Sequence, residues 1–152
     1  MIFNQVNNFD DREHEALMGI WSTGILLKQQ SRRFFKDYVV SESQFNVIMT
    51  LKYAEKPLSQ QALSERLLVD KSNLTGLVDG LEKLGFVKRR NVPNDRRLYR
   101  LELTEKGTSF LDEVEPSYRK LVKKIMSVYS ADDLKQITAY MVRLQEGLDD
   151  NK

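Results

Sequence analysis

The chain has 152 residues, enough for one domain, or one domain with an extension, and for a substantial core. Its composition, 30% charged and 41% hydrophobic, is that of an ordinary soluble globular protein, and the absence of cysteine excludes disulfides, thiol nucleophiles and cysteine-ligated zinc. The first residues lack the pattern of a signal peptide and no apolar run approaches the ~18 residues of a membrane span, so we expect a cytoplasmic protein without membrane contact.

Positive charge is concentrated in one segment. Residues 70–100 contain eight Lys or Arg against four Asp or Glu, a net charge of +4, whereas the rest of the chain contains 16 against 18. A localised basic segment is typical of a protein that binds a polyanion. On charge alone, a solvated basic surface is an equally good interpretation.

Helical periodicity predicts a first helix over residues 12–38. Ser41 and Gln44 then have the spacing of a capping box and begin a second helix, which we expect to end before Pro57. Both helices carry an apolar stripe along one side.

The segment 58–85 predicts two short helices joined by a tight turn. Ser59 and Asp70 are the expected N-caps, and Gly85 is the expected left-handed stop. The second of these helices is fully amphipathic. Such a pair is a helix-turn-helix pattern, although any helical hairpin in a bundle resembles it.

After Gly85 the period changes from that of a helix to that of a strand. The segments FVKRRNV and RLYRLELT alternate between apolar and polar residues, and the Pro-Asn-Asp between them is typical of a turn. A β-hairpin that directly follows a helix-turn-helix is the plan of a winged helix. The combination is more specific than either part.

Two further helices are predicted beyond the hairpin. Thr104 is the expected cap of the first, Pro116 within it predicts a kink or a local break, and Ser130 with Asp133 opens the second. Together with the first helix they carry long apolar stripes that flank a centre with its own core. Because two-fold dimers are the commonest oligomers, we expect these stripes to associate with a second copy.

The predicted fold class is therefore mainly α with a small β-hairpin wing. We expect a winged helix-turn-helix DNA-binding domain at residues 41–103, flanked by a helical dimerisation region formed by residues 1–40 and 104–152.

The helix that begins after Asp70 presents short polar residues on its exposed N-terminal part. We predict that Lys71 contacts a DNA phosphate and that Ser72, Asn73 and Thr75 reach base edges, because these side chains suit the major groove. Gly76 lacks a side chain, which either allows close approach of the backbone to DNA or reflects packing inside the protein.

The hairpin supplies the remaining predicted DNA contacts. Arg96 and Arg97 lie beside the turn, where an arginine suits the negative potential of a narrow minor groove, and Asp95 is predicted to support Arg97. Arg89 is predicted to contact a phosphate, as are other strand cations, some of which we expect to face water. The alternative for Arg96 and Arg97 is a solvated hairpin end.

The hairpin also carries a family motif. Asp95-Arg96-Arg97, five residues, Leu103-Thr104, two residues and Gly107 resemble the D-x-R-x5-L-T-x2-G wing signature of MarR-family transcriptional regulators, and LTGLVDGLEKLGFVKR is similar to that family's recognition helix. The resemblance covers nearly the whole chain.

This resemblance implies a homodimeric repressor that binds palindromic operators in double-stranded DNA and is released by a small aromatic or anionic effector or by oxidation. It implies that Arg97 is the minor-groove arginine, that Asp95 supports it, and that Gln44 contacts a phosphate. It also places Ser72, Asn73 and Thr75 at base-reading positions.

The sequence differs from the family pattern in two ways that limit what the resemblance implies. Gly76 stands where many members carry a basic or polar residue, and the lack of cysteine excludes thiol oxidation as a release mechanism. The single histidine, His14, argues against the zinc-sensing branch. We therefore expect neither a metal nor a cofactor.

Four aromatic residues are candidates for the wall of an effector pocket where the long helices meet the winged-helix body. They are Trp21, Phe34, Phe45 and Tyr118. A plain core role is the favoured alternative for them.

The sequence leaves two alternative functions, a protein-contact module and an enzyme. A winged helix can serve protein contacts instead of DNA contacts, in which case the arginines would meet acidic side chains. An enzyme is disfavoured, because the sequence has no phosphate loop, nucleophile elbow, dinucleotide fingerprint or metal-ligand spacing.

Overall fold

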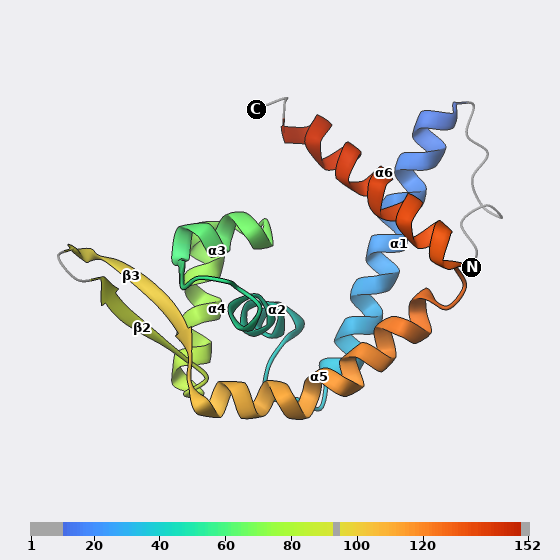
Figure 1. The fold of residues 1–152 in the computed structure, drawn as a ribbon. Helices are drawn as coiled ribbons and strands as arrows, with labels where there is room; N and C mark the ends of the chain where they lie inside the picture. Colours follow the sequence, from blue (N-terminus) through green and yellow to red (C-terminus); the bar gives the residue numbers. More distant parts are fainter. Residues whose placement is uncertain (1–10, 93–94, 150–152) are drawn as a thin grey trace. The chain divides into compact units, whose positions relative to one another are not determined.

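The computed structural model describes residues 11–92 and 95–149, and of residue 92 and residues 95–98 it describes the backbone alone. The elements in chain order are α1 (Arg12–Phe35), α2 (Glu42–Lys52), β1 (Leu58–Ser59), α3 (Gln60–Leu67), α4 (Lys71–Lys83), β2 (Val87–Val92), β3 (Asp95–Leu103), α5 (Glu105–Met126) and α6 (Ala131–Asp149) (Figure 1). They form two compact units, Met1–Leu111 and Asp112–Lys152, each of which is described by itself.

The first unit contains the helix-turn-helix and the hairpin. Figure 1 shows β2 and β3 extending as a hairpin from the part of the unit that contains α2, α3 and α4. The core between these helices is made of large apolar side chains that are fully buried: Phe45 and Ile48 of α2, Leu63 of α3, and Leu74, Val78 and Leu81 of α4. Their burial fixes which side of α4 faces outward.

Local hydrogen bonds explain where the helices begin. The predicted capping box is confirmed: the amide of Gln44 donates to Ser41 Oγ at 3.3 Å, and the amide of Ser41 donates to Gln44 Oε1 at 3.0 Å. Ser59 is also confirmed as a cap, because its Oγ accepts from the amide of Ala62.

Asp70 occupies the N-cap position of α4, but the prediction that its side chain caps the helix is wrong. Its backbone is extended and its carbonyl accepts the first helical bond, from Leu74, whereas its carboxylate receives no capping hydrogen bond. The side chain is exposed, so water can solvate the carboxylate in place of the helix amides.

The turn between α3 and α4 contains a backbone conformation that is unusual for its residue. Leu68 has φ 52° and is the one non-glycine residue with positive φ in the described chain. Such a conformation costs a leucine roughly 1–2 kcal/mol, because Cβ crowds the following carbonyl. Its side chain is 79% exposed, so burial of that side chain does not offset the cost.

The hairpin belongs to a three-stranded antiparallel sheet in the order β1-β3-β2. Leu58 of β1 pairs with Leu101 of β3, and both side chains are buried. The sequence did not predict β1, because two residues are too few to show strand alternation. Arg89 of β2 also pairs with Leu101, so β2 lies at one edge of the sheet.

A compact joint links the end of α4, the hairpin and the start of α5. Gly85 has φ 75°, which confirms the predicted left-handed stop. Thr104 Oγ1 donates to the carbonyl of Gly85 at 2.6 Å and accepts from the amide of Gly107 at 3.0 Å, which confirms the predicted cap. The amide of Thr104 donates to the carbonyl of Phe86 at 3.0 Å.

Within the second unit, α5 is continuous through Pro116, so the predicted local break does not occur. Buried Glu115 accepts from Nε of Arg119 at 2.7 Å, a pair one helical turn apart. The predicted cap of α6 is confirmed: the hydroxyl and the amide of Ser130 donate to Asp133 Oδ2 and hold the pKa of Asp133 below its usual range.

Within the part of the chain that the structure describes, every helix is too short or too polar to cross a bilayer.

Replacing Gly107 tests the joint. A Cβ at this position would lie 2.2 Å from the carbonyl oxygen of Phe86, so Gly107→Ala should lower the free energy of unfolding by about 2–3 kcal/mol through overpacking. The measurement is urea unfolding followed by circular dichroism. Gly76→Ala is the matched control, because no heavy atom lies within 4 Å of its Cβ; an equal loss of stability in both variants would contradict the prediction.

Candidate nucleic-acid interface

The outward side of α4 is polar over its first two turns. Lys71, Ser72 and Asn73 are exposed, as predicted, while Leu74 between them and Thr75 is buried. Exposed short polar side chains on a helix that is anchored by its opposite side can reach a groove without disturbing the core. This face is therefore a candidate for contact with base edges.

Gly76 continues this exposed face with a position that has no side chain. It is exposed, and a Cβ placed there would meet no heavy atom within 4 Å. The packing interpretation of this glycine therefore has no support within the described chain. Close approach of the backbone to DNA stays a prediction for this position.

Thr75 is only partly available. Its hydroxyl donates to the carbonyl of Lys71 at 2.8 Å and accepts from Nε2 of Gln60 at 2.6 Å. The prediction that Thr75 reads a base stays a prediction; because the hydroxyl is engaged inside the protein, such a contact would use the methyl group, which can contact a thymine methyl. Gln60 was missed by sequence reasoning, because its partner lies 15 residues away.

Gln44 has a structural role besides its predicted phosphate contact. Its Oε1 completes the cap of α2, and its Nε2 lies where a Cβ on Gly80 of α4 would meet it at 2.6 Å. Gln44 thus packs α2 against α4. The phosphate contact stays a prediction.

Arg89 lies between the hairpin and α4. Its Nη1 pairs with Oε2 of Glu82, its Nη2 lies 2.7 Å from Oδ1 of Asp79, and its backbone amide donates to Oε1 of Glu82 at 3.0 Å. Sequence reasoning missed the two carboxylates; their spacing of seven and ten residues from Arg89 is a signal only once the helix and the strand are known to be adjacent. The predicted phosphate contact of Arg89 remains untested.

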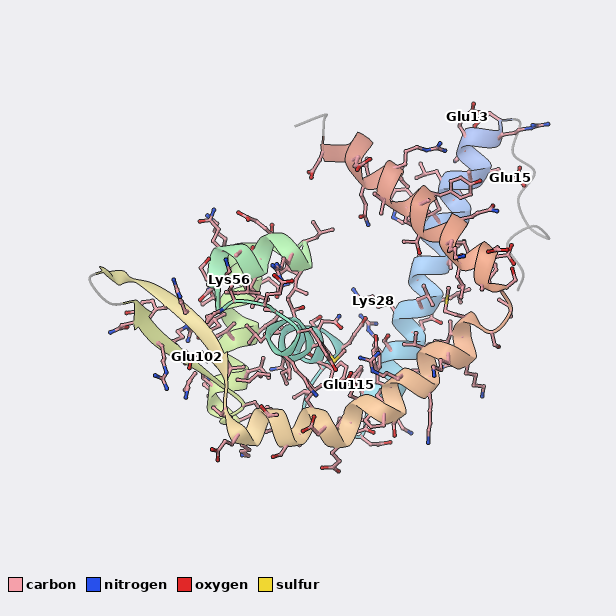
Figure 2. All side chains as sticks on the ribbon, viewed as in Figure 1. Glu13, Glu15, Lys28, Lys56, Glu102 and Glu115 are labelled. Atoms are coloured by element: carbon pink, nitrogen blue, oxygen red, sulfur yellow. The ribbon has the colours of Figure 1, made fainter. Side chains whose placement is uncertain are left out.

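Among the residues whose side chains the structure describes, the opposite face of the hairpin carries three cations and one acid. Glu102, labelled in Figure 2, lies 2.8 Å from Nε of Arg90 and 3.8 Å from Nζ of Lys88. Arg100, which pairs in register with Arg90, has no ion pair among the described residues. Two cations of this face, Lys88 and Arg90, are therefore paired with the same acid inside the protein.

Three predicted residues are placed by their backbone alone. Asp95, Arg96 and Arg97 form the start of β3, and the predicted turn before them lies outside the described residues. Their side chains lie outside the described residues, so the minor-groove role of Arg97 and the supporting role of Asp95 stay predictions.

The candidate pocket aromatics have different environments. Phe45 is fully buried and its ring centroid lies 4.9 Å from that of Phe35, which also contacts Phe34. Trp21 is 64% exposed, and Tyr118 is half-buried in the second unit. Phe34 and Phe45 thus belong to an aromatic cluster of the first unit.

A cavity of about 390 Å³ lies elsewhere in the first unit. Its wall comes from α1, α2, the end of α3 and the turn after it, and α4: Gly24, Leu27, Lys28, Ser31, Glu42, Ser43, Asn46, Leu67, Val69 and Leu77. Lys28, labelled in Figure 2, is its one cationic wall residue. None of the predicted pocket aromatics lines it.

No group of three or more metal-ligating side chains occurs among the described residues.

A helix-turn-helix, a hairpin rich in arginine and an outward polar helix face define a winged helix-turn-helix protein of the kind that binds nucleic acid. Comparison of the chain with known proteins and protein families agrees with this class. The family model described as "MarR family" matches residues 40–99. The chain is 30% identical over 127 residues to the HTH-type transcriptional repressor YetL of Bacillus subtilis, covering 83% of this chain and 76% of that protein.

Two further similarities extend this result. The chain is 36% identical over 116 residues to the transcriptional repressor MprA of Escherichia coli, covering 74% of this chain and 66% of that protein. Its fold matches that of Sco3205, a MarR family transcriptional regulator from Streptomyces coelicolor solved in complex with DNA, with a TM-score of 0.85 and 22% identity over 93% of this chain and 94% of that one.

The chain belongs to the MarR family of transcriptional regulators. The resemblance seen in the wing motif is thereby confirmed, as is the winged helix-turn-helix fold. The relatives are regulators and not enzymes, in agreement with the sequence.

Gly76→Ala should change fold stability and DNA affinity in opposite directions. A helical alanine in open space should raise the free energy of unfolding by about 0.5–1 kcal/mol, whereas the added methyl should hinder close approach to DNA and lower affinity. Urea unfolding and fluorescence anisotropy with a selected DNA duplex measure the two effects. Unchanged affinity would show that α4 does not approach DNA at this position.

Proposed function

We propose that the protein is a homodimeric, sequence-specific DNA-binding repressor that acts on a palindromic operator in the cytoplasm. The observation that carries the proposal is the exposed polar face of α4, from Lys71 to Gly76, on a helix whose opposite side is anchored in the core by Leu74, Val78 and Leu81. Residues 41–103 would form the DNA-binding domain.

In this proposal α4 enters the major groove. Ser72, Asn73 and the methyl of Thr75 would contact base edges, and Lys71 and Gln44 would contact phosphates. Arg96 and Arg97 would enter the adjacent minor groove at the tip of the hairpin, with Asp95 supporting Arg97. The membership of the chain in a family of transcriptional regulators supports this assignment.

Exposed apolar side chains support the dimer. On α1 they are Leu17, Ile20, Trp21, Ile25, Leu26 and Leu27, and on α6 they are Tyr140, Val142, Leu144 and Leu148. No residue of α6 is buried in the single chain. Rows of exposed large apolar groups on two long helices are costly in water, and a second copy would cover them. Residues 1–40 and 104–152 would supply this dimerisation region.

The effector is proposed from the family resemblance: a small aromatic or anionic molecule that releases the operator. The cavity beside Lys28 has a volume within the range of small-molecule sites.

An aromatic carboxylate that binds in this cavity should raise the melting temperature of the protein, and Lys28→Gln should reduce that rise. An unchanged melting temperature of the wild-type protein would contradict the proposed effector site.

Arg97→Ala and Asn73→Ala should weaken binding in different ways. Loss of a minor-groove arginine should lower affinity about tenfold for all operator variants, whereas loss of Asn73 should remove about 1–3 kcal/mol of discrimination at a single base pair. Titrations at several salt concentrations, on duplexes selected from a random pool, measure both. Random duplex that remains unbound at low salt would instead favour a protein-binding role for the winged helix.

Trp21→Glu should shift the dimer toward the monomer, because it places a charge among the exposed apolar residues of α1. Sedimentation velocity at micromolar concentration measures this shift. Asn91→Asp, an exposed polar position outside the proposed dimerisation region, is the control and should leave the dimer intact. If the wild-type chain sediments as a monomer, the proposal that it forms a dimer is wrong.

A further inference from the structure

The hairpin is joined to α4 by one side chain. Arg89 projects from β2 and pairs with Asp79 and Glu82, which lie one helical turn apart on α4. The backbone amide of Arg89 also donates to Glu82, so Glu82 contacts both the backbone and the guanidinium of Arg89. The two terminal nitrogens of the guanidinium thus contact two different carboxylates. Hydrogen bonds between charged groups of this kind are directional as well as electrostatic.

The position of Arg89 in the sheet makes these contacts important. The strand order β1-β3-β2 leaves β2 at the edge, paired with β3 alone. A two-stranded ribbon is only marginally stable by itself, and β1 contributes just two residues, which pair with β3 and not with β2. The edge strand therefore depends on other contacts to keep its orientation.

Arg89 is also a poor candidate for a free phosphate contact. Its side chain is 23% exposed, whereas that of Arg90 on the other face is 62% exposed. The two carboxylates within contact distance give the cluster of Arg89, Asp79 and Glu82 a net charge of −1. A cluster with that charge does not attract a phosphate while the pairs are intact.

We propose that Arg89 is a positioning residue that fixes the hairpin against α4, so that operator affinity depends on Asp79 and Glu82 even though both are acids. The proposal rests on the proposed function, because it concerns two elements that would enter neighbouring grooves. A hairpin held in place before binding would spare the cost of ordering it on the DNA.

The sign of the effect distinguishes positioning from phosphate contact. If the acids only oppose DNA, then Asp79→Asn with Glu82→Gln removes two negative charges and frees Arg89, and affinity rises. If they position the hairpin, the same variant binds the operator roughly fivefold to tenfold more weakly. We expect the weaker binding.

Glu102→Gln is the matched control. Glu102 is also an acid on the hairpin and also pairs with cations, but it lies on the opposite face and contacts neither Arg89 nor α4 in the described pairs. Its neutralisation should leave affinity unchanged or raise it. Melting by circular dichroism confirms that each variant is folded.

Arg89→Gln gives a second readout. Removal of a phosphate contact lowers the slope of log affinity against log salt by about one, whereas loss of a positioning residue weakens binding with the slope unchanged. Arg89→Lys keeps the charge but not the two-pronged geometry and should bind almost as weakly as Arg89→Gln. Full affinity in Arg89→Lys would overturn the proposal.

A measurement without DNA tests the positioning directly. Because the chain has no cysteine, spin labels can be placed at Lys83→Cys on α4 and Asn91→Cys on β2, both exposed positions, and diluted with unlabelled protein. The distance distribution should broaden in the Asp79→Asn, Glu82→Gln variant and not in Glu102→Gln. An unchanged distribution refutes the positioning role, whereas failure of the wild-type chain to bind any duplex refutes the proposed function alone.

Discussion

The close contact between Gly107 and the backbone of Phe86 is the constraint on which the first unit depends. The hairpin must leave α4 and return to nearly the same place, and it does so because Thr104 bonds to Gly85 while Gly107 allows α5 to begin against Phe86. Lys106 adds a bond from Nζ to the carbonyl of Leu84 at 2.7 Å. The motif Leu103-Thr104-x-x-Gly107 thus has a mechanical meaning: it closes the base of the hairpin.

Compensation of charge inside the hairpin changes the meaning of the basic segment. The count of cations over residues 70–100 overstates what DNA would meet, because Arg89 is paired with two acids and Lys88 and Arg90 share Glu102. Lys71, Lys83 and Arg100 are the described cations of this segment that combine an exposed position with the absence of an ion pair among the described residues. Local pairing therefore decides where a polyanion is attracted, and net charge alone does not.

The sequence was sufficient for the elements whose signals are local. Caps at Ser41, Ser59 and Thr104, the stop at Gly85 and the outward face of α4 all follow from spacing within a few residues, and the structure confirms them. Contacts between distant segments could not be predicted in this way. The bond from Gln60 to Thr75 and the pairs of Arg89 depend on how helices and strands pack.

The departures from local rules gather around α4. Leu68 adopts a left-handed conformation, Asp70 makes no capping bond, and Gly76 weakens the helix without filling any close contact. The left-handed Leu68 is accompanied by hydrogen bonds that close α3, from the amides of Leu68 and Val69 to the carbonyls of Glu65 and Ser64, whereas Gly76 has no compensating close contact in the described chain. Natural proteins retain such costs mainly at functional sites. All three lie at or before the first two turns of α4, where the exposed polar side chains also lie, in keeping with the proposal that this end of the helix contacts DNA.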